Sequence, residues 1–305
     1  MLTRRKKKQT AALVAGYPFA RSGNLYHILH SGQSLQLGGA GTPALQGVTV
    51  YSNFDLEATR TSLMLLQNTS EEQPRLASAD WKTSVEGWVS VHTQHSGGGR
   101  AYVDLKQGTS YYIDALDAVQ GVQDIIAASG GAYTGRVYLV DLVHGEQDEK
   151  DHDDRALYKS YLEEWQTDYD TDIKAITGQV ETVYLVYDQI SSHAYSAVCD
   201  ICLAQYETAK ENPTTHFLVC PKYMFEYVDS SHMDNVSYQW LGEYHGKVQR
   251  EVINSGAWSP LWPTSVTRVG AVITATFNVP EPPIVFDTTI VPAAYANYGF
   301  EFSQV

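Results

Sequence analysis

A serine placed just after a predicted strand is the first side chain in this sequence that could act as a nucleophile. The run Leu25–His30 is short, mostly apolar and typical of a buried strand, and Ser34 follows it in Gly32-Gln33-Ser34. Ligands of open α/β sheets bind at the carboxyl ends of strands, so Ser34 stands where catalytic nucleophiles are found. A serine beside glycine is also a common turn former or helix cap. The motif alone leaves both interpretations open.

An aspartate and a histidine much later in the chain could complete the chemistry. Asp229 and His232 share one predicted loop, between the predicted strand His216–Cys220 and a predicted helix. At this spacing the carboxylate can accept the imidazole Nδ1–H and leave Nε2 free to act as a base. The same pair could instead cap a helix or provide half of a metal site.

Two further loops could supply hydrogen-bond donors to a developing oxyanion. Gly130 and Gly131 follow the predicted strand Val122–Ala128, and Gln147 follows the predicted strand Val137–Val143. A glycine N–H and a side-chain amide both stabilise the negative charge that forms in acyl transfer. If Gln147 is such a donor, its replacement by alanine lowers turnover by roughly a hundredfold to a thousandfold. Taken singly, these residues are ordinary turn glycines and an exposed polar residue.

These residues need a scaffold that brings the ends of different strands together, and the sequence predicts one. Short runs rich in Val, Ile, Leu and Tyr alternate with helical patterns, which is typical of a mostly parallel sheet flanked by helices. The predicted core strands are Leu25–His30, Val122–Ala128, Val137–Val143, Thr182–Tyr187 and His216–Cys220. Because the candidate residues follow different parallel strands, we expect them to meet at one edge of the sheet.

Two helices are predicted from apolar residues that recur every three or four positions. The first covers residues 158–176 and is expected to end at Gly178, since glycine adopts the left-handed conformation that terminates many helices. The second covers residues 236–248, directly after the Asp229 to His232 loop, with Asp234 or Asn235 as its N-cap.

The chain is predicted to divide into three parts. Residues 1–23 contain five consecutive basic residues before a short apolar stretch, and we interpret them as a basic arm rather than a signal peptide. Residues 24–257 contain every candidate catalytic residue. From residue 258 onward prolines punctuate β-type runs such as Val272–Phe277, so residues 258–305 are predicted to form a small β-rich extension.

The composition is ordinary for a soluble globular protein, with 43% hydrophobic and 18% charged residues, and the formal net charge is −14. A negative charge of this size repels the phosphates of nucleic acids and anionic lipids, so neither is an expected partner. No stretch approaches the roughly 18 consecutive apolar residues of a membrane span. We therefore expect neither a nucleic acid nor a membrane as a partner.

The cysteines and one acidic cluster are candidates for redox or metal sites. Cys199, Cys202 and Cys220 are an odd number, which argues against a disulfide framework. Cys199 and Cys202 form a C-x-x-C inside a predicted helix, with no second pair to complete a zinc site, so we expect free buried thiols. His152 lies among acidic residues at a helix start, where such charges are usually solvated. No metal and no cofactor is expected.

Four short motifs together resemble those of the SGNH hydrolases, in the branch of carbohydrate acetylesterases and sialate-O-acetylesterase-like domains. Gly32-Gln33-Ser34 is similar to the first block of that family, and Ser129-Gly130-Gly131 is similar to the second. Gly145-Glu146-Gln147-Asp148 resembles the third block, although many relatives have Asn where Gln147 stands. Asp229-Ser230-Ser231-His232 resembles the fifth block, D-x-x-H, and the resemblance spans residues 24–251.

The resemblance implies a three-layer α/β/α sandwich with a flavodoxin-like, mostly parallel sheet of five strands. It implies that Ser34, His232 and Asp229 form a triad that removes acetyl groups from a carbohydrate through an acyl-enzyme, without a cofactor. The implied oxyanion hole consists of the Ser34 N–H, a glycine of the second block (Gly130 or Gly131) and the Gln147 amide.

A softer resemblance concerns the residues before Ser34 and Pro221-Lys222-Tyr223, which are similar to segments of bacteriophage tail proteins. The expected partner is an acetylated glycan, and this second resemblance implies a virion-associated or extracellular protein that assembles into a virion or homo-oligomer.

Two alternatives stay open: a glycan-binding or structural virion module without activity, and an esterase for aliphatic esters. The presence of every triad residue argues against the first, and the lack of a long apolar lid argues against the second. The 21 tyrosines and 6 tryptophans offer rings on which sugars could stack, although most must serve the core.

Overall fold

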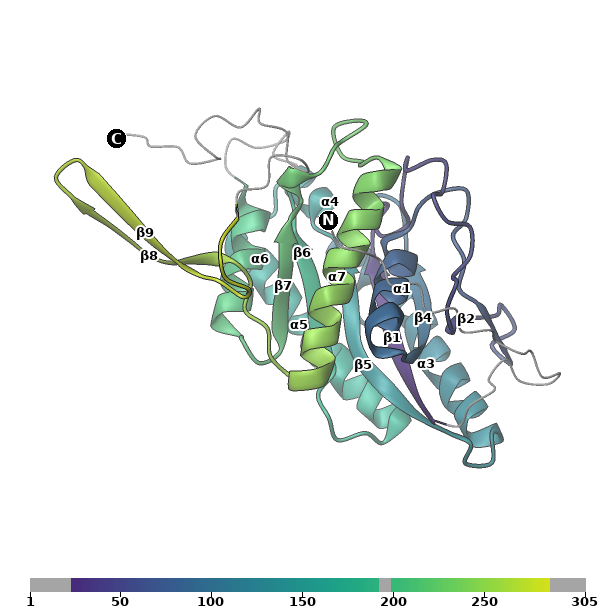
Figure 1. The fold of residues 1–305 in the computed structure, drawn as a ribbon. Coiled ribbons are helices and arrows are strands. Elements are labelled where there is room, and N and C mark those ends of the chain that lie inside the picture. Colours follow the sequence, from purple (N-terminus) through teal and green to yellow (C-terminus); the bar gives the residue numbers. More distant parts are fainter. Residues whose placement is uncertain (1–22, 192–198, 286–305) are drawn as a thin grey trace.

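The dominant element of the computed structural model, which describes residues 23–191 and 199–285, is a seven-stranded sheet (Figure 1). Its strands are β1 (Gly23–Gly32), β2 (Asn53–Leu56), β3 (Leu63–Leu65), β4 (Val89–Ser96), β5 (Tyr133–Val143), β6 (Tyr184–Gln189) and β7 (His216–Pro221). They are arranged in the order β3-β2-β4-β1-β5-β6-β7, and every neighbouring pair is parallel except β2 and β3. The predicted basic arm lies outside the described residues, apart from Gly23.

Helices cover both faces of the sheet and produce three layers (Figure 1). One face carries α1 (Pro74–Glu86) and α7 (Asn235–Ser255), and the other carries α3 (Ser110–Ala128), α5 (Arg155–Thr177) and α6 (Asp200–Glu211). The short elements α2 (Tyr102–Leu105), α4 (Glu146–Lys150) and the 3-10 turn η1 (Lys222–Met224) lie in the connections. The predicted three-layer α/β/α sandwich is confirmed, but the sheet has seven strands instead of five.

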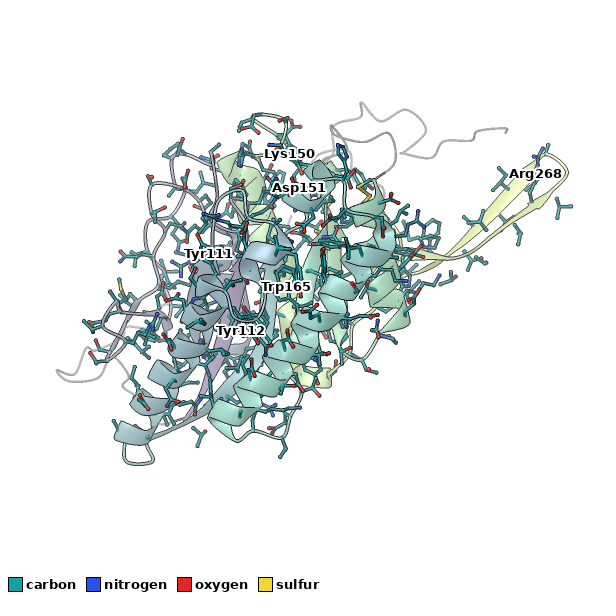
Figure 2. All side chains as sticks on the ribbon, turned by 180° about the vertical axis from the view of Figure 1, so that it is seen from behind. Tyr111, Tyr112, Lys150, Asp151, Trp165 and Arg268 are labelled. Atoms are coloured by element: carbon teal, nitrogen blue, oxygen red, sulfur yellow. A yellow bond between two sulfur atoms is a disulfide. The ribbon has the colours of Figure 1, made fainter. Side chains whose placement is uncertain are left out.

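Large aromatic residues fill the space between the layers. Trp165 of α5 and Tyr112 of α3 are fully buried on one face of the sheet, as Figure 2 shows from behind. On the other face, Tyr238 and Leu241 of α7 pack in a second buried cluster with Phe217 of β7. Burying such side chains is the main favourable term in folding, so the helices are held firmly against the sheet.

The close packing of α7 on α1 depends on two glycines. A Cβ atom at Gly242 would collide with the carbonyl oxygen of Pro74, and one at Gly246 would lie 2.8 Å from the carbonyl oxygen of Ser78. Only residues without a side chain permit this approach of the two backbones. Because α7 begins directly after His232, its docking on α1 also fixes the position of the loop that carries the candidate base.

Both predicted helices are confirmed and extend further than expected. α5 ends at Gly178, which has the left-handed φ of 69° that side chains disfavour. The N-cap of α7 is Asp234, whose carboxylate accepts the Ser237 N–H at 2.8 Å. This cap satisfies one of the free N–H groups at the start of the helix.

One predicted strand is wrong, and three strands of the sheet, β2, β3 and β4, were missed. The run Val122–Ala128 belongs to α3, whose buried residues Val119, Val122 and Ile125 repeat with the helical period. β4 was missed because its buried side chains are largely polar, including His92 and Thr93, and so do not form an apolar run. The other four predicted strands overlap β1, β5, β6 and β7.

The chain after α7 forms an arm that projects from the body (Figure 1). Its strands β8 (Trp262–Val269) and β9 (Val272–Asn278) pair only with each other, and Arg268 lies near the tip (Figure 2). Apart from its base, the hairpin is exposed, including Val266 and Val269. Within the described ranges, no helix combines the length and the apolar character needed to cross a bilayer.

Candidate active site

The loop after β1 presents Ser34 at the carboxyl edge of the sheet. Gly32 has a φ of 139°, and a Cβ there would collide with the carbonyl oxygen of Val143 on the neighbouring strand. The chain then coils into a tight turn, in which the N–H groups of Leu37 and Gly39 donate to the carbonyl oxygen of Ser34 at 3.1 and 2.8 Å. The turn holds the Ser34 backbone, so the hydroxyl has a defined direction.

The structure brings Ser34, His232 and Asp229 into one hydrogen-bonded series. The Ser34 Oγ lies 2.8 Å from His232 Nε2, and His232 Nδ1 lies 2.9 Å from Asp229 Oδ2. The loop that carries Asp229 and His232 follows β7, which is separated from β1 by β5 and β6. All three side chains therefore meet at the carboxyl edge, as the parallel sheet predicts.

Asp229 is held as an ionised carboxylate that orients the imidazole. Its second oxygen, Oδ1, accepts the backbone N–H groups of Ser231 and His232, each at 2.7 Å. Partial burial raises the pKa of Asp229, but these N–H groups and the His232 side chain lower it more, so it lies below its ordinary value. A carboxylate at Nδ1 fixes the tautomer that leaves Nε2 free to accept the Ser34 proton.

A cavity of about 360 Å³ opens beside Ser34. Its lining comes from the loops after β1, β4, β5 and β7, through Gln33, Gly99, Gln147 and His232 among others. Among the described residues that line it, none is aromatic; the large tyrosines lie in the core. Most of the described lining residues are glycine or carry a polar side chain.

Backbone N–H groups at this cavity are available as donors. In the described part of the chain, the N–H groups of Ser34, Gly98 and Gly99 have no hydrogen-bond partner. Unpaired N–H groups beside a nucleophile are the arrangement that stabilises an oxyanion. Sequence reasoning missed Gly98 and Gly99 because β4 was missed. The glycine run directly after the β-type segment 89–96 was the signal that could have identified them.

Gln147 lines the cavity, but its side-chain amide is occupied. The amide Nε2 donates to Asp151 Oδ1 at 2.8 Å, one turn further along the chain. The backbone N–H of Gln147 donates instead to the side chain of Gln33 at 3.2 Å. The expected bond from the Gln147 amide towards an oxyanion is therefore replaced, in this structure, by a bond to Asp151.

Gly130 and Gly131 do not belong to the site. They lie in the turn between α3 and β5, beside Gly23, whose N–H donates to the Ala132 carbonyl oxygen at 3.0 Å. This is the amino end of β1 and β5, whereas Ser34 follows their carboxyl ends. The full length of a ten-residue strand separates the two places, roughly 30 Å at the usual rise per residue. Gly130 and Gly131 were expected at the carboxyl end of a strand, but the preceding residues 122–128 belong to the helix α3.

Charged side chains are buried under the carboxyl edge, between the sheet and α7. Asp141 on β5 lies 2.6 Å from His245 Nδ1 and 3.0 Å from His30 Nδ1, and His245 Nε2 lies 3.5 Å from Asp188 on β6. Burial lowers the pKa of His245, but Asp141 and Asp188 raise it more, to about 9. Burial lowers the pKa of His30 to about 4. His245 is therefore the charged histidine of this cluster.

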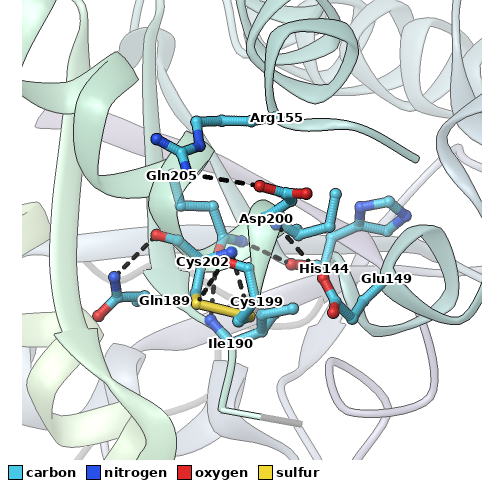
Figure 3. The surroundings of a disulfide bond; sticks show 10 residues. His144, Glu149, Arg155, Gln189, Ile190, Cys199, Asp200, Cys202 and Gln205 are labelled. Carbon is cyan, nitrogen blue, oxygen red and sulfur yellow. Dashed lines mark hydrogen bonds and ion pairs between the residues drawn. A yellow bond between two sulfur atoms is a disulfide. The ribbon is translucent and has the colours of Figure 1, made fainter. Parts of the chain in front are cut away.

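Cys199 and Cys202 form a disulfide instead of the expected free thiols (Figure 3). Cys199 is the N-cap of α6, outside the helix proper, and its Cα lies 5.5 Å from that of Cys202, which suits a disulfide. α6 also contacts the residue before the third block, because the side-chain amide of Gln205 donates to the His144 carbonyl oxygen at 2.9 Å. Cys220 is a free, buried thiol.

Comparison with known proteins gives a fold but no family. No family model and no curated sequence matches this chain. Among solved structures, a protein from Arabidopsis thaliana has a TM-score of 0.60 at 15% identity, over 73% of this chain and 97% of that chain. A carbohydrate acetylesterase from Xanthomonas citri has a TM-score of 0.58 at 14% identity, over 83% of this chain and 62% of that chain. NanS has a TM-score of 0.56 at 10% identity, over 77% of this chain and 98% of that chain. The chain therefore shares its α/β/α fold with these three proteins.

Proposed function

We propose that this protein is a serine esterase in which Ser34 attacks the carbonyl carbon of an ester bound in the cavity. The observation that carries the proposal is the series from Ser34 through His232 to Asp229, with distances of 2.8 and 2.9 Å. It lies beside unpaired backbone donors at the only edge of the sheet where ligands bind in this class of fold. Residues 24–257 contain all of these groups.

The proposed reaction has two steps. His232 Nε2 accepts the Ser34 proton as Oγ attacks, and the imidazolium is stabilised by the Asp229 carboxylate. The oxyanion of the tetrahedral intermediate accepts hydrogen bonds from the N–H groups of Ser34 and of Gly98 or Gly99. His232 then protonates the leaving alcohol. Water releases the acyl group from Ser34 by the same sequence of proton transfers.

We propose that the ester is an acetyl ester of a carbohydrate. The cavity of about 360 Å³ is near the lower limit for ligand sites and is lined mainly by glycine and polar side chains. Such a cavity suits a short acyl group attached to a polar alcohol. The fold shared with a carbohydrate acetylesterase from Xanthomonas citri supports the same substrate class.

Acetate release from O-acetylated bacterial polysaccharides and plant glycans tests this proposal. We expect acetate to be released from at least one glycan. We also expect a small chromogenic acetyl ester to be hydrolysed at least about a hundredfold faster than its long-chain homologue, since Leu35 is the one large apolar side chain among the described residues that line the cavity. Preference for the long chain would contradict the acetylesterase proposal and favour an esterase for aliphatic esters. Glycan binding without any ester hydrolysis would favour a binding or structural module.

Gln147→Ala tests whether the oxyanion is bound by the Gln147 side-chain amide or by the backbone N–H groups described above. Because the Gln147 amide is bonded to Asp151 and the backbone N–H groups are free, we expect kcat to fall by less than about fivefold. Steady-state kinetics on the small acetyl ester provide the measurement, with Asp151→Ala as the matched control that releases the same amide. A loss in kcat of about a hundredfold or more would indicate that the Gln147 side-chain amide donates to the oxyanion.

A further inference from the structure

A fully buried lysine lies where the loops of the site come together. Lys222 is 0% exposed and belongs to η1, directly after β7, in the segment that leads to Asp229 and His232. Its Nζ lies 2.5 Å from Glu146 Oε1, at the start of α4, and 3.0 Å from Asp188 Oδ1 at the end of β6. One ammonium group thus joins the carboxyl ends of β5, β6 and β7.

Glu146 continues this connection to the nucleophile loop. Its other oxygen, Oε2, accepts the side-chain amide of Gln33 at 2.5 Å, and Gln33 immediately precedes Ser34. The carbonyl oxygen of the same Gln33 side chain accepts the Gln147 N–H at 3.2 Å. Gln33 and Glu146 are only 3% and 4% exposed, so water does not replace these bonds.

Lys222 has to be charged to make this arrangement stable. Burial lowers its pKa, but Asp188 and Glu146 raise it more, to well above the ordinary value for lysine. His245 supplies the second positive charge of the cluster, on the far side of Asp188. Two carboxylates therefore face Lys222 directly, and removal of its charge would leave them opposite each other in a buried site.

We propose that Lys222 is a positioning residue, which holds the Ser34 loop in register with the His232 loop through Glu146 and Gln33. The inference rests on the proposed esterase function and adds a residue that contacts neither Ser34 nor the ester. It follows from geometry, because Lys222 lies on the loop of the base, whereas Gln33 lies on the loop of the nucleophile. A displacement of about 1 Å between nucleophile and base lowers turnover by about a hundredfold.

Lys222→Met is the direct test. Methionine keeps the length of the side chain without its charge, so Glu146 loses its partner and the Gln33 amide loses its fixed acceptor. We expect kcat for the small acetyl ester to fall by about a hundredfold while KM changes by less than about threefold, because the ester does not contact Lys222. Activities are to be normalised to the folded fraction, which near-ultraviolet circular dichroism measures.

Lys82→Met is the matched control. Lys82 is also 0% exposed, but it lies on α1 and donates to Gln249 of α7, away from the loops of the site. Burial lowers the pKa of Lys82 to about 7, so an uncharged residue is tolerated there. We expect this variant to keep kcat within about threefold of wild type, whatever its stability.

A second variant keeps the proposal testable if Lys222→Met folds poorly. In the double variant Lys222→Met with Glu146→Gln, the glutamine can still accept the Gln33 amide, and one of the opposed carboxylates is gone. We expect kcat to recover by about tenfold relative to Lys222→Met alone, as two residues of one network do not act additively. The single variant Glu146→Gln, in which an amide faces the Lys222 ammonium, is expected to lose about tenfold in kcat.

The outcomes separate this inference from the esterase proposal. If Lys222→Met and Lys82→Met have equal kcat values per folded molecule, Lys222 has no positioning role. The same holds if Lys222→Met changes KM and leaves kcat intact. A wild-type protein that hydrolyses no ester, and whose Ser34 is not labelled by a fluorophosphonate, would instead overturn the esterase proposal itself.

Discussion

Ser34→Ala is expected to abolish ester hydrolysis, with a loss in kcat on the order of a millionfold. The Ser34 Oγ is the atom that would bond to the acyl carbon, and His232 has no other hydroxyl within its hydrogen-bonded series. Without it, the cavity can still bind an ester and polarise its carbonyl, but no acyl-enzyme can form. Acetate release and hydrolysis of the small chromogenic ester give the measurement, with thermal denaturation to verify the fold.

Ser231→Ala is the control for this variant. Ser231 lines the same cavity, and its contribution to Asp229 comes through a backbone N–H at 2.7 Å, which alanine retains. We expect its kcat to lie within about fivefold of wild type. If Ser34→Ala kept wild-type activity and Ser231→Ala lost it, the nucleophile would be Ser231, and the proposed mechanism would be wrong.

His245→Ala is expected to lower the free energy of unfolding by about 3–5 kcal/mol, as is usual when one partner of a buried ion pair is removed. His245 lies between Asp141, at 2.6 Å, and Asp188, at 3.5 Å, and all three side chains are buried. Alanine leaves Asp141 without its charged partner, whereas Asp188 keeps Lys222 at 3.0 Å. Urea unfolding followed by tryptophan fluorescence near pH 7 measures the difference.

The effect of this substitution should depend on pH in a definite direction. The pKa of His245 is raised from its ordinary 6.5 to about 9, so the folded protein binds this proton more tightly than the unfolded chain does. The stabilisation is fully present below about pH 6.5 and is lost as the pH rises through about 9. The difference between wild type and His245→Ala should therefore shrink between about pH 6 and pH 10.

His152→Asn is the control for the stability measurement. His152 is exposed and has a left-handed φ of 64°, which asparagine accepts. We expect it to change the free energy of unfolding by less than about 0.5 kcal/mol at any of these pH values. A difference for His245→Ala that stayed constant with pH would mean that His245 is not the residue that holds the proton.

The fold could be predicted from sequence where local pattern and tertiary environment agree. α5 shows this, because its apolar stripe, its N-cap Asp154 and the terminal Gly178 all indicate the same helix. β1, β5 and β7 are buried on both faces and so appear as apolar runs. The segment 122–128 failed because a short apolar run is compatible with either state, and α3 starts twelve residues earlier, at Ser110.

The polar strand β4 could not be recognised from such runs. His92 is fully buried, and its ring nitrogens bond His30 at 2.8 Å and Ser90 at 3.0 Å. Both bonds compensate for burying polar groups, and the one to His30 joins β4 to β1, so no local pattern reveals it. Gly98 and Gly99 were not predicted as donors because the strand that precedes them was not predicted.

For the site, the sequence predicted that Ser34, Asp229 and His232 would meet, but it wrongly placed Gly130 and Gly131 beside them and did not predict what holds the three side chains. Ser34 follows β1, whereas Asp229 and His232 share the loop after β7, and these positions after two parallel strands were sufficient to predict their proximity. Lys222 and Glu146 are 76 positions apart, and their pairing depends on how β5, β6 and β7 are arranged. A lysine in a sequence is normally read as exposed, because buried lysines occur only when paired.

The distance along the chain between the nucleophile and its base also affects how the protein is made. Ser34 precedes His232 by 198 residues, and the histidine depends on α7, which follows it, for its place against α1. At about 5–20 residues per second, a ribosome adds the histidine roughly 10–40 s after the serine. During that time the nascent chain carries a serine without its proton acceptor. The proposed hydrolytic activity is therefore expected only after translation has passed α7, and its onset in a synchronised translation reaction would report the folding of the whole sandwich.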